Sequence, residues 1–360
     1  MKFRSIFTFW VVASAAVAQV ATISITPHAS AAPSPTAKLA STQHEEKRVP
    51  TAGAAVLGYV LGPGPAEVHP IFGTATRPQL GAPAAVPTSA KRLYLPPRQQ
   101  YVLVEQSADE PVAVWALHRA IANSETAEPI AIKGAMAHPD LVVFSPRGDA
   151  AVFYSQAAAS LQVLTHLPAE PSLSRQFSIA ALGTPSGLAI TDDGALVVAG
   201  LADHSLAFSL DGAPWQPLTT GYTPQAWTFI PRTHDLAMSD VAQQTIVLLS
   251  NLSEASKAVR VLAQDVAANR LAVTKNGDQL VAADTQAGQL WTIDLKTATL
   301  TPQEGFAKLD TLSSLRDGFT FLLSTSPSLS LLKLAASPDS RDLAVGAGTV
   351  GWNQDAKGGR

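Results

Sequence analysis

The sequence predicts an all-β protein built from repeated units that close into a ring. The stretch GLAITDDGALVVAG, residues 187–200, joins two short apolar runs through a tight turn, and similar stretches recur about every 40 residues. The runs are short and bounded by Gly, Pro, Asp and Asn, which is typical of antiparallel hairpins. Long amphipathic helical stretches are missing from the sequence.

Aligning the turns identifies four further clear copies of the unit. They are VVFSPRGDAAVFY (142–154), WTFIPRTHDLAMS (227–239), LAVTKNGDQLVAA (271–283) and LSSLRDGFTFLLS (312–324). In the copy at 227–239, His and Asp replace the turn glycine. A third apolar run such as QLWTID and a weaker fourth such as FSIAALG follow, so each unit predicts a four-stranded antiparallel sheet.

Two weaker copies precede these five, a degenerate one at 93–118 and half of one at 57–73. Seven units of about 42 residues match the length of a β-propeller blade, and six blades of about 50 residues are the alternative. Stacking blades in a ring buries both apolar faces of every sheet and leaves no long open edge. The incomplete first unit is expected to share a strand with residues 341–348 at the other end.

The repeats resemble a known family. SGLAITDDGALVVAG and GQLWTIDLKTATL are similar to the YVTN/NHL and WD40-like β-propeller repeats, in which an apolar strand, a Ser-Pro-Asp-Gly-like turn and two further strands recur. The resemblance implies the propeller fold. It implies little about function, because such rings serve as scaffolds, binding proteins and occasionally enzymes.

The N-terminal 31 residues have the pattern of a secretory signal peptide. Lys2 and Arg4 precede an apolar run that ends in small residues, with cleavage sites after Ala31 or Ala18. An uncleaved membrane anchor is the alternative. No later stretch is long and apolar enough to span a bilayer, so no membrane association is expected after cleavage.

The remaining chain divides into three parts. Residues 32–53, rich in Pro, Ser, Thr and Ala, predict a flexible linker, residues 54–351 the propeller, and residues 352–360 a disordered tail. The chain has no cysteine, which together with export favours a bacterial periplasmic or extracellular protein whose stability comes from its core. A net charge of −3 gives no basic field for nucleic acid.

A ring of polar residues is the predicted binding site. The position just before the first strand of a unit is polar in six copies, and in a propeller this strand lines the central channel. The six residues are Lys91, Asp140, Ser186, Gln225, Asn269 and Asp310. They are expected either to form a ligand-binding ring at one channel mouth or to bond the backbone of adjacent loops. Asp140, Asn269 and Asp310 carry the oxygen ligands that hard cations prefer, and they are the only indication of a cation-binding site in the sequence.

No catalytic residue, metal site or cofactor is predicted. Loop histidines such as His138, His204 and His234 lack zinc spacing and are expected to be exposed or bonded to backbone. GAGTVG, residues 346–351, lacks the helix that a dinucleotide site needs, and Asp192 and Asp193 are explained by the turn that contains them. Trp115 and Trp291 occupy equivalent third-strand positions and are expected to pack between blades.

These observations favour a secreted or periplasmic, non-enzymatic propeller that binds an unidentified protein or small ligand at its channel mouth. One alternative is a propeller hydrolase, similar to lactonases, with a cation at the polar ring. A second is a structural subunit of an envelope complex that binds through the flanks of its blades.

Overall fold

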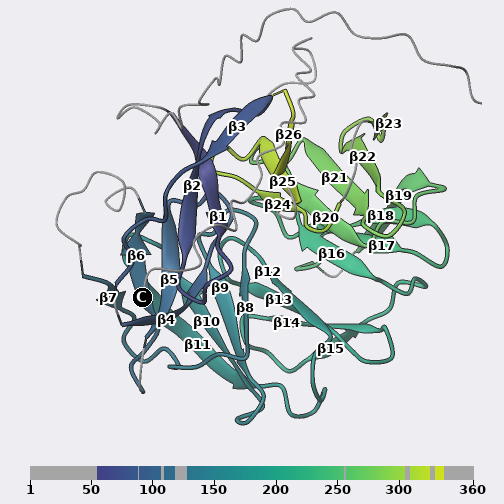
Figure 1. Cartoon of the computed structure of the whole chain (residues 1–360). Helices are drawn as coiled ribbons and strands as arrows, with labels where there is room; N and C mark the ends of the chain where they lie inside the picture. Colours follow the sequence, from purple (N-terminus) through teal and green to yellow (C-terminus); the bar gives the residue numbers. More distant parts are fainter. Residues whose placement is uncertain are drawn as a thin grey trace, which may run out of the picture. The chain divides into compact units, whose positions relative to one another are not determined.

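The computed structural model describes residues 55–87, 89–106, 109–117, 128–254, 257–304, 309–324 and 329–335. These residues form 26 strands in seven separate antiparallel sheets, all within one compact unit, residues 48–360. In Figure 1 the sheets surround a common centre, and the last strands, in yellow, lie beside the first, in purple. The predicted seven-bladed propeller is confirmed and the six-bladed alternative is wrong.

The first four blades follow the chain, with strands paired in sequence order. Blade 1 contains β1 (Val56–Leu61), β2 (Val68–Thr74) and β3 (Arg77–Leu80). Blade 2 contains β4 (Ala90–Tyr94), β5 (Tyr101–Gln106), β6 (Ala113–Ala116) and β7 (Ile130–Ala131). Blade 3 contains β8 (Leu141–Phe144), β9 (Ala151–Ser155), β10 (Ser160–Thr165) and β11 (Ser172–Ser178). Blade 4 contains β12 (Gly187–Ile190), β13 (Leu196–Gly200), β14 (Leu206–Leu210) and β15 (Gln216–Leu218).

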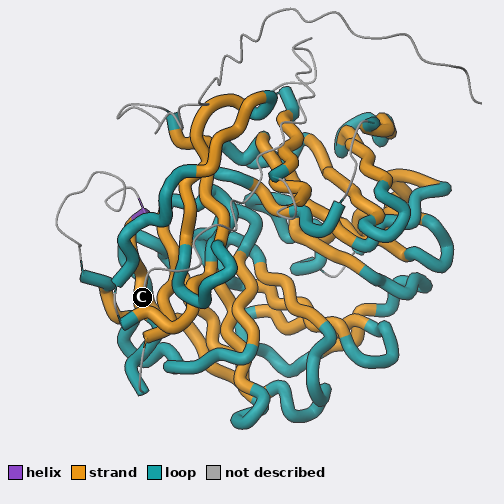
Figure 2. The backbone as a smooth tube through the Cα atoms, in the orientation of Figure 1, coloured by secondary structure: helices purple, strands orange, loops and turns teal. Residues whose placement is uncertain are grey.

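The last three blades continue this order. Blade 5 contains β16 (Ala226–Phe229), β17 (Leu236–Asp240), β18 (Thr245–Ser250) and β19 (Ala258–Gln264). Blade 6 contains β20 (Arg270–Val273), β21 (Gln279–Asp284), β22 (Gln289–Asp294) and β23 (Leu300–Gln303). Blade 7 contains β24 (Ser313–Ser314), β25 (Thr320–Ser324) and β26 (Ser330–Lys333). The backbone in Figure 2 accordingly alternates between strand and short loop.

Five blades have four described strands and two have three. The two weak copies in the sequence are real blades, since 57–73 falls on β1 and β2 and 93–118 begins on β4. The predicted leader, linker and tail and the predicted closing strand at 341–348 lie outside the described residues. Among those described, no helix is long and apolar enough to cross a membrane.

Each blade buries both of its faces because side chains alternate along its strands. On β9, Ala151 and Phe153 pack toward blade 2, whereas Val152 and Tyr154 pack toward blade 4. The same alternation occurs on β5, β13 and β21. Such middle strands are therefore almost continuously apolar, unlike the alternating strands of a sheet that faces water.

Seven apolar clusters hold the ring together, one between each pair of neighbouring blades. The seventh joins the ends of the chain: Val60 and Ile71 of blade 1 pack with Leu315, Leu322 and Leu331 of blade 7. This packing closes the ring independently of any shared strand.

The turn between the first two strands of a blade is stabilised from within. In blade 4, the buried Thr191 hydroxyl donates to Asp193 Oδ1 at 2.6 Å and accepts from Leu196 N at 3.1 Å. Ser145 and Thr274 accept equivalent bonds in blades 3 and 6. Gly194 has a φ of 72°, which a glycine adopts without strain. This chemistry explains why the turn motif recurs.

Two glycines of blade 4 are required for space. Gly187 and Gly200 are directly paired across β12 and β13, and the indole of Trp227 on β16 lies against both. A Cβ at Gly187 would lie 2.9 Å from Trp227 Cζ2, and one at Gly200 would overlap the same ring. The glycine pair thus makes the flat surface on which blade 5 places its tryptophan.

We expect Gly200→Ala to lower the free energy of unfolding by about 1–3 kcal/mol, because the added methyl group forces Trp227 out of its packed position. Urea unfolding measures this cost. In a Trp227→Leu background the same substitution should cost much less, since the shorter side chain leaves room. An equal cost in both backgrounds would contradict the contact.

Candidate functional site: the central channel

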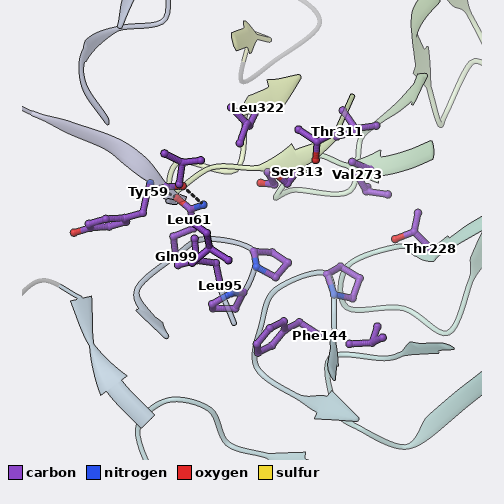
Figure 3. Close-up of a pocket in the computed structure, with 18 of the residues that line it drawn as sticks. Tyr59, Leu61, Leu95, Gln99, Phe144, Thr228, Val273, Thr311, Ser313 and Leu322 are labelled. Carbon is purple, nitrogen blue, oxygen red and sulfur yellow. Dashed lines mark hydrogen bonds between the residues drawn. The ribbon is translucent and has the colours of Figure 1, made fainter. Parts of the chain in front are cut away.

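The first strands of the blades surround a central channel. β8, β12, β16, β20 and β24 contact one another in turn, which makes the first strand of each blade the innermost. They enclose a cavity of about 630 Å³ lined by residues of six blades. In Figure 3 the labelled residues surround this space, with Thr228 across from Gln99 and Leu61. The cavity is within the size range of small-molecule sites.

The cavity wall is mainly apolar, with hydroxyl groups on one side. Leu95, Phe144 and Val273 contribute apolar surface, whereas blades 5 and 7 contribute hydroxyls. Thr228 Oγ1 donates only to Phe229 O at 3.5 Å, and the hydroxyl of Ser313 forms no hydrogen bond within the described part of the chain. The wall therefore offers apolar contact together with hydroxyls free to bond a ligand.

A buried amide closes the wall between blades 1 and 2. Gln99 is 4% exposed, and its side chain accepts from Tyr59 N at 2.7 Å and donates to Tyr59 O at 2.9 Å. The pair of bonds satisfies both backbone groups of Tyr59 as a neighbouring strand would. Figure 3 shows these bonds and the Tyr59 ring directed away from the cavity.

The predicted polar ring occupies equivalent backbone positions in five blades. In these blades the amide of the residue donates to the carbonyl of a residue at or near the end of the second strand, at 2.8–3.0 Å. The five are Asp140, Ser186, Gln225, Asn269 and Asp310. Lys91 differs, because it lies within β4 at a register shift between Ala90 and Arg92.

Several of these side chains bond the loop beside their own strand. Asp140 Oδ2 accepts from Gln156 N at 2.6 Å, Asn269 Oδ1 from Thr285 N at 3.1 Å, and Asp310 Oδ2 from the Ser324 hydroxyl at 3.1 Å. The first two bonds fix the turn after the second strand, and the third reaches the last residue of β25. The alternative role given by the sequence, bonding to the backbone of adjacent loops, is thus observed for Asp140 and Asn269, whereas Asp310 bonds a side chain of β25.

The six residues lie where the first strands begin, and none of them lines the cavity. The structure does not bring Asp140, Asn269 and Asp310 together as a cation site: no group of three or more histidine, aspartate or glutamate side chains able to hold a metal occurs among the described residues. A ligand-binding role for this ring remains a prediction.

Two of the three loop histidines pair with carboxylates rather than with backbone. His138 Nδ1 lies 3.0 Å from Glu105 Oε1, and His234 Nε2 lies 2.8 Å from Asp193 Oδ2. His138 and His204 are exposed, as predicted, whereas His234 is partly buried. Sequence reasoning missed both pairs because the partners are 33 and 41 residues apart.

The predicted tryptophan packing is confirmed. Trp115 on β6 is 1% exposed and lies in the cluster between blades 1 and 2, and Trp291 on β22 is buried between blades 5 and 6.

Glu105 organises a polar network near the start of the channel strands. Its Oε2 accepts from the Tyr94 hydroxyl at 2.8 Å and lies 3.5 Å from Arg92 Nη1. Burial raises the pKa of Tyr94 to about 12, a shift that Arg92 opposes and Glu105 increases. Tyr94 therefore remains protonated near neutral pH and can donate to Glu105. With His138, this network links blades 2 and 3.

Asp192 links three blades at the other end of the channel. From blade 4, its Oδ1 accepts from Arg147 N in blade 3 and its Oδ2 from Arg232 N in blade 5, both at 2.8 Å. The turns that follow the first strands therefore meet at one end, here named the turn end of the channel. The sequence analysis attributed both Asp192 and Asp193 to the needs of the turn that contains them. In the structure only the Asp193 side chain bonds within that turn.

The comparisons with known proteins identify no family and show a likeness of fold alone. No protein-family model matches the sequence, and no curated protein matches it significantly. A functionally unknown protein from Desulfotomaculum acetoxidans DSM 771 superposes with a TM-score of 0.54 at 12% identity, over 82% of this chain and 98% of that one.

Two further solved structures match with lower TM-scores. The Cps50 (Swd1) β-propeller domain of Myceliophteria thermophila gives a TM-score of 0.44 at 15% identity, over 59% of this chain and 71% of that one. Hsv2 of Kluyveromyces lactis gives 0.49 at 11% identity, over 68% and 73%. The chain is a seven-bladed β-propeller. The narrower YVTN/NHL resemblance remains a prediction.

We expect Asp192→Ala to lower the free energy of unfolding by about 2 kcal/mol, because two backbone amides of neighbouring blades lose a charged acceptor. The urea midpoint measures the effect. Asp203→Ala is the control, since Asp203 bonds only Ser205 in its own loop, and its midpoint should stay close to that of the wild type. Equal midpoints for the two variants would contradict the bridge.

Proposed function

We propose that this chain is an exported, non-enzymatic binding protein whose channel holds a small, mainly apolar ligand or an apolar side chain of a partner protein. One observation carries the proposal: residues of six blades enclose a cavity of about 630 Å³ with apolar walls and a few hydroxyls. Ligand pockets have this size and this mixture of surfaces.

The lining supports binding rather than chemistry. Its polar groups are hydroxyls and one amide, and Gln99 already bonds Tyr59 with both ends of its amide. A hydroxyl needs an adjacent base to become a nucleophile, and among the described residues no histidine, aspartate or glutamate contributes to the cavity wall. The proposed role is therefore that of a scaffold with an internal ligand site.

We expect Thr228→Phe to weaken binding of the neutral fluorophore N-phenyl-1-naphthylamine about tenfold or more, because the larger side chain occupies part of the cavity. The wild-type protein should bind one fluorophore per chain, measured by the rise in its fluorescence.

Thr301→Phe is the matched control, since Thr301 is exposed on the outer strand β23 and does not line the cavity. It should bind the fluorophore as the wild type does. Equal affinities for the two variants would show that the fluorophore binds elsewhere and would overturn the cavity as the binding site.

Export rests on the sequence of the first 31 residues. We expect the protein expressed with its leader in a bacterium to be recovered outside the cytoplasm and to begin at Ala32, or at Gln19 if the earlier site is used. Intact mass and N-terminal sequencing distinguish these outcomes. Recovery of a chain that still begins at Met1 would contradict cleavage.

A further inference from the structure

A set of basic side chains surrounds the turn end of the channel. The turn between the first and second strands carries an arginine or lysine in blades 2, 3, 5, 6 and 7. These residues are Arg98, Arg147, Arg232, Lys275 and Arg316. In blade 4 the corresponding turn carries Asp192, whose carboxylate is bonded to the backbone amides of the two flanking turns.

Three of the guanidinium groups lie close enough to influence one another. Burial lowers the pKa of Arg98, and the positive charges of Arg147 and Arg232 lower it further, while Asp149 and Asp192 oppose this. Three arginines and two aspartates leave this group with one net positive charge. The hydrogen bonds of Asp192 hold the turns that bear Arg147 and Arg232 at fixed positions.

Two nitrogens of the Arg98 guanidinium group have no hydrogen-bond partner among the described residues. Its Nε and Nη2 are buried without a hydrogen bond, and no carboxylate of the described residues lies within ion-pair distance of it. Arg147 Nε is also buried without a hydrogen bond, but it has an ion-pair partner, since it lies 3.1 Å from Asp149 Oδ2. Buried donors of this kind are costly unless an acceptor is supplied, and charged donors most of all.

The backbone at two of these arginines is strained. Arg98 and Arg232 both have a φ of 64°, in the left-handed region that glycine adopts most easily. Glycine occurs nearby in other copies of the turn, at Gly148, Gly194 and Gly277. Arginine therefore occupies a conformation that glycine would adopt with less strain, as nine other non-glycine residues in the described part of the chain also do.

We propose that Arg98, Arg147 and Arg232 form a binding site for an oxyanion, a carboxylate or phosphate group, at the turn end of the channel. Guanidinium groups bind both anions through paired N–H donors in a planar fork. The cavity wall includes Pro96, Pro97 and Pro146, which directly precede Arg98 and Arg147, so the site adjoins the cavity. It stands on its own observations and does not depend on the proposed apolar ligand.

The test is a titration of the full-length protein with inorganic phosphate and, separately, with succinate. Isothermal titration calorimetry measures the binding, in chloride buffer of constant ionic strength. At least one anion should bind saturably with one site per chain. Tighter binding of phosphate would indicate a phosphate-bearing ligand, and tighter binding of succinate a carboxylate-bearing one.

Arg98→Gly should weaken anion binding about tenfold or more, because it removes the buried donors. Its thermal unfolding midpoint should stay equal to that of the wild type or rise, because glycine relieves the strained φ. Arg98→Gln, which keeps most of the side chain without the charge, should lose binding as well. Loss of binding with preserved stability separates a binding role from a structural one.

Arg270→Ala is the matched control, because Arg270 is exposed at the first residue of β20, at the end of the channel opposite the turns. Its anion affinity should equal that of the wild type. Absence of saturable binding of either anion to the wild type, or unchanged binding in Arg98→Gly, would overturn the site. Fluorophore binding in the cavity is measured separately, so either proposal can fail without the other.

Discussion

The burial of both faces of every sheet is the constraint on which the structure depends. A four-stranded sheet of this composition has two apolar faces, and one neighbour can cover only one of them. The seven clusters between blades meet this requirement only if the last blade also packs on the first. Packing of Val60 and Ile71 against Leu315 and Leu322 therefore covers the two faces that an open row of blades would leave exposed, one on blade 1 and one on blade 7.

The central channel is a consequence of ring closure. In a ring of seven blades the innermost strands of opposite blades do not meet, and a cavity of about 630 Å³ remains between them. Its two ends differ in chemistry because the first strands all run in the same sense. Polar side chains that fix loops lie where these strands begin, and arginine-bearing turns joined by Asp192 lie where they end. The cavity, the arginine cluster and the polar ring are thus three distinct surfaces.

The sequence predicts the fold well because blade structure is local. Strand, turn and strand fall within about 15 consecutive residues, so the turn of Thr191 to Gly194 and its apolar flanks can be recognised without a structure. Contacts between blades depend on closure and join residues far apart in the sequence. Gln99 bonds a residue 40 positions away, and Asp192 bonds residues 45 and 40 positions away. No local pattern signals these contacts.

The candidate site was predicted less completely than the fold. Alignment of the repeats placed Asp140 and its counterparts at equivalent positions, which the structure shows, but alignment cannot tell which way a side chain turns. The same alignment contains basic residues in five turns, a signal that was available in the sequence. Its significance becomes clear only in the structure, where Nε and Nη2 of Arg98 are buried without a hydrogen-bond partner among the residues described.

Hydrogen exchange of backbone amides followed by mass spectrometry tests ring closure most directly. Because blade 7 covers blade 1, the amides of β2 and β25 should open with about the same free energy as those of β13 in the middle of the chain. Opening of β2 and β25 several kcal/mol more easily than β13 would contradict the account, because the ring would then be open between its first and last blades.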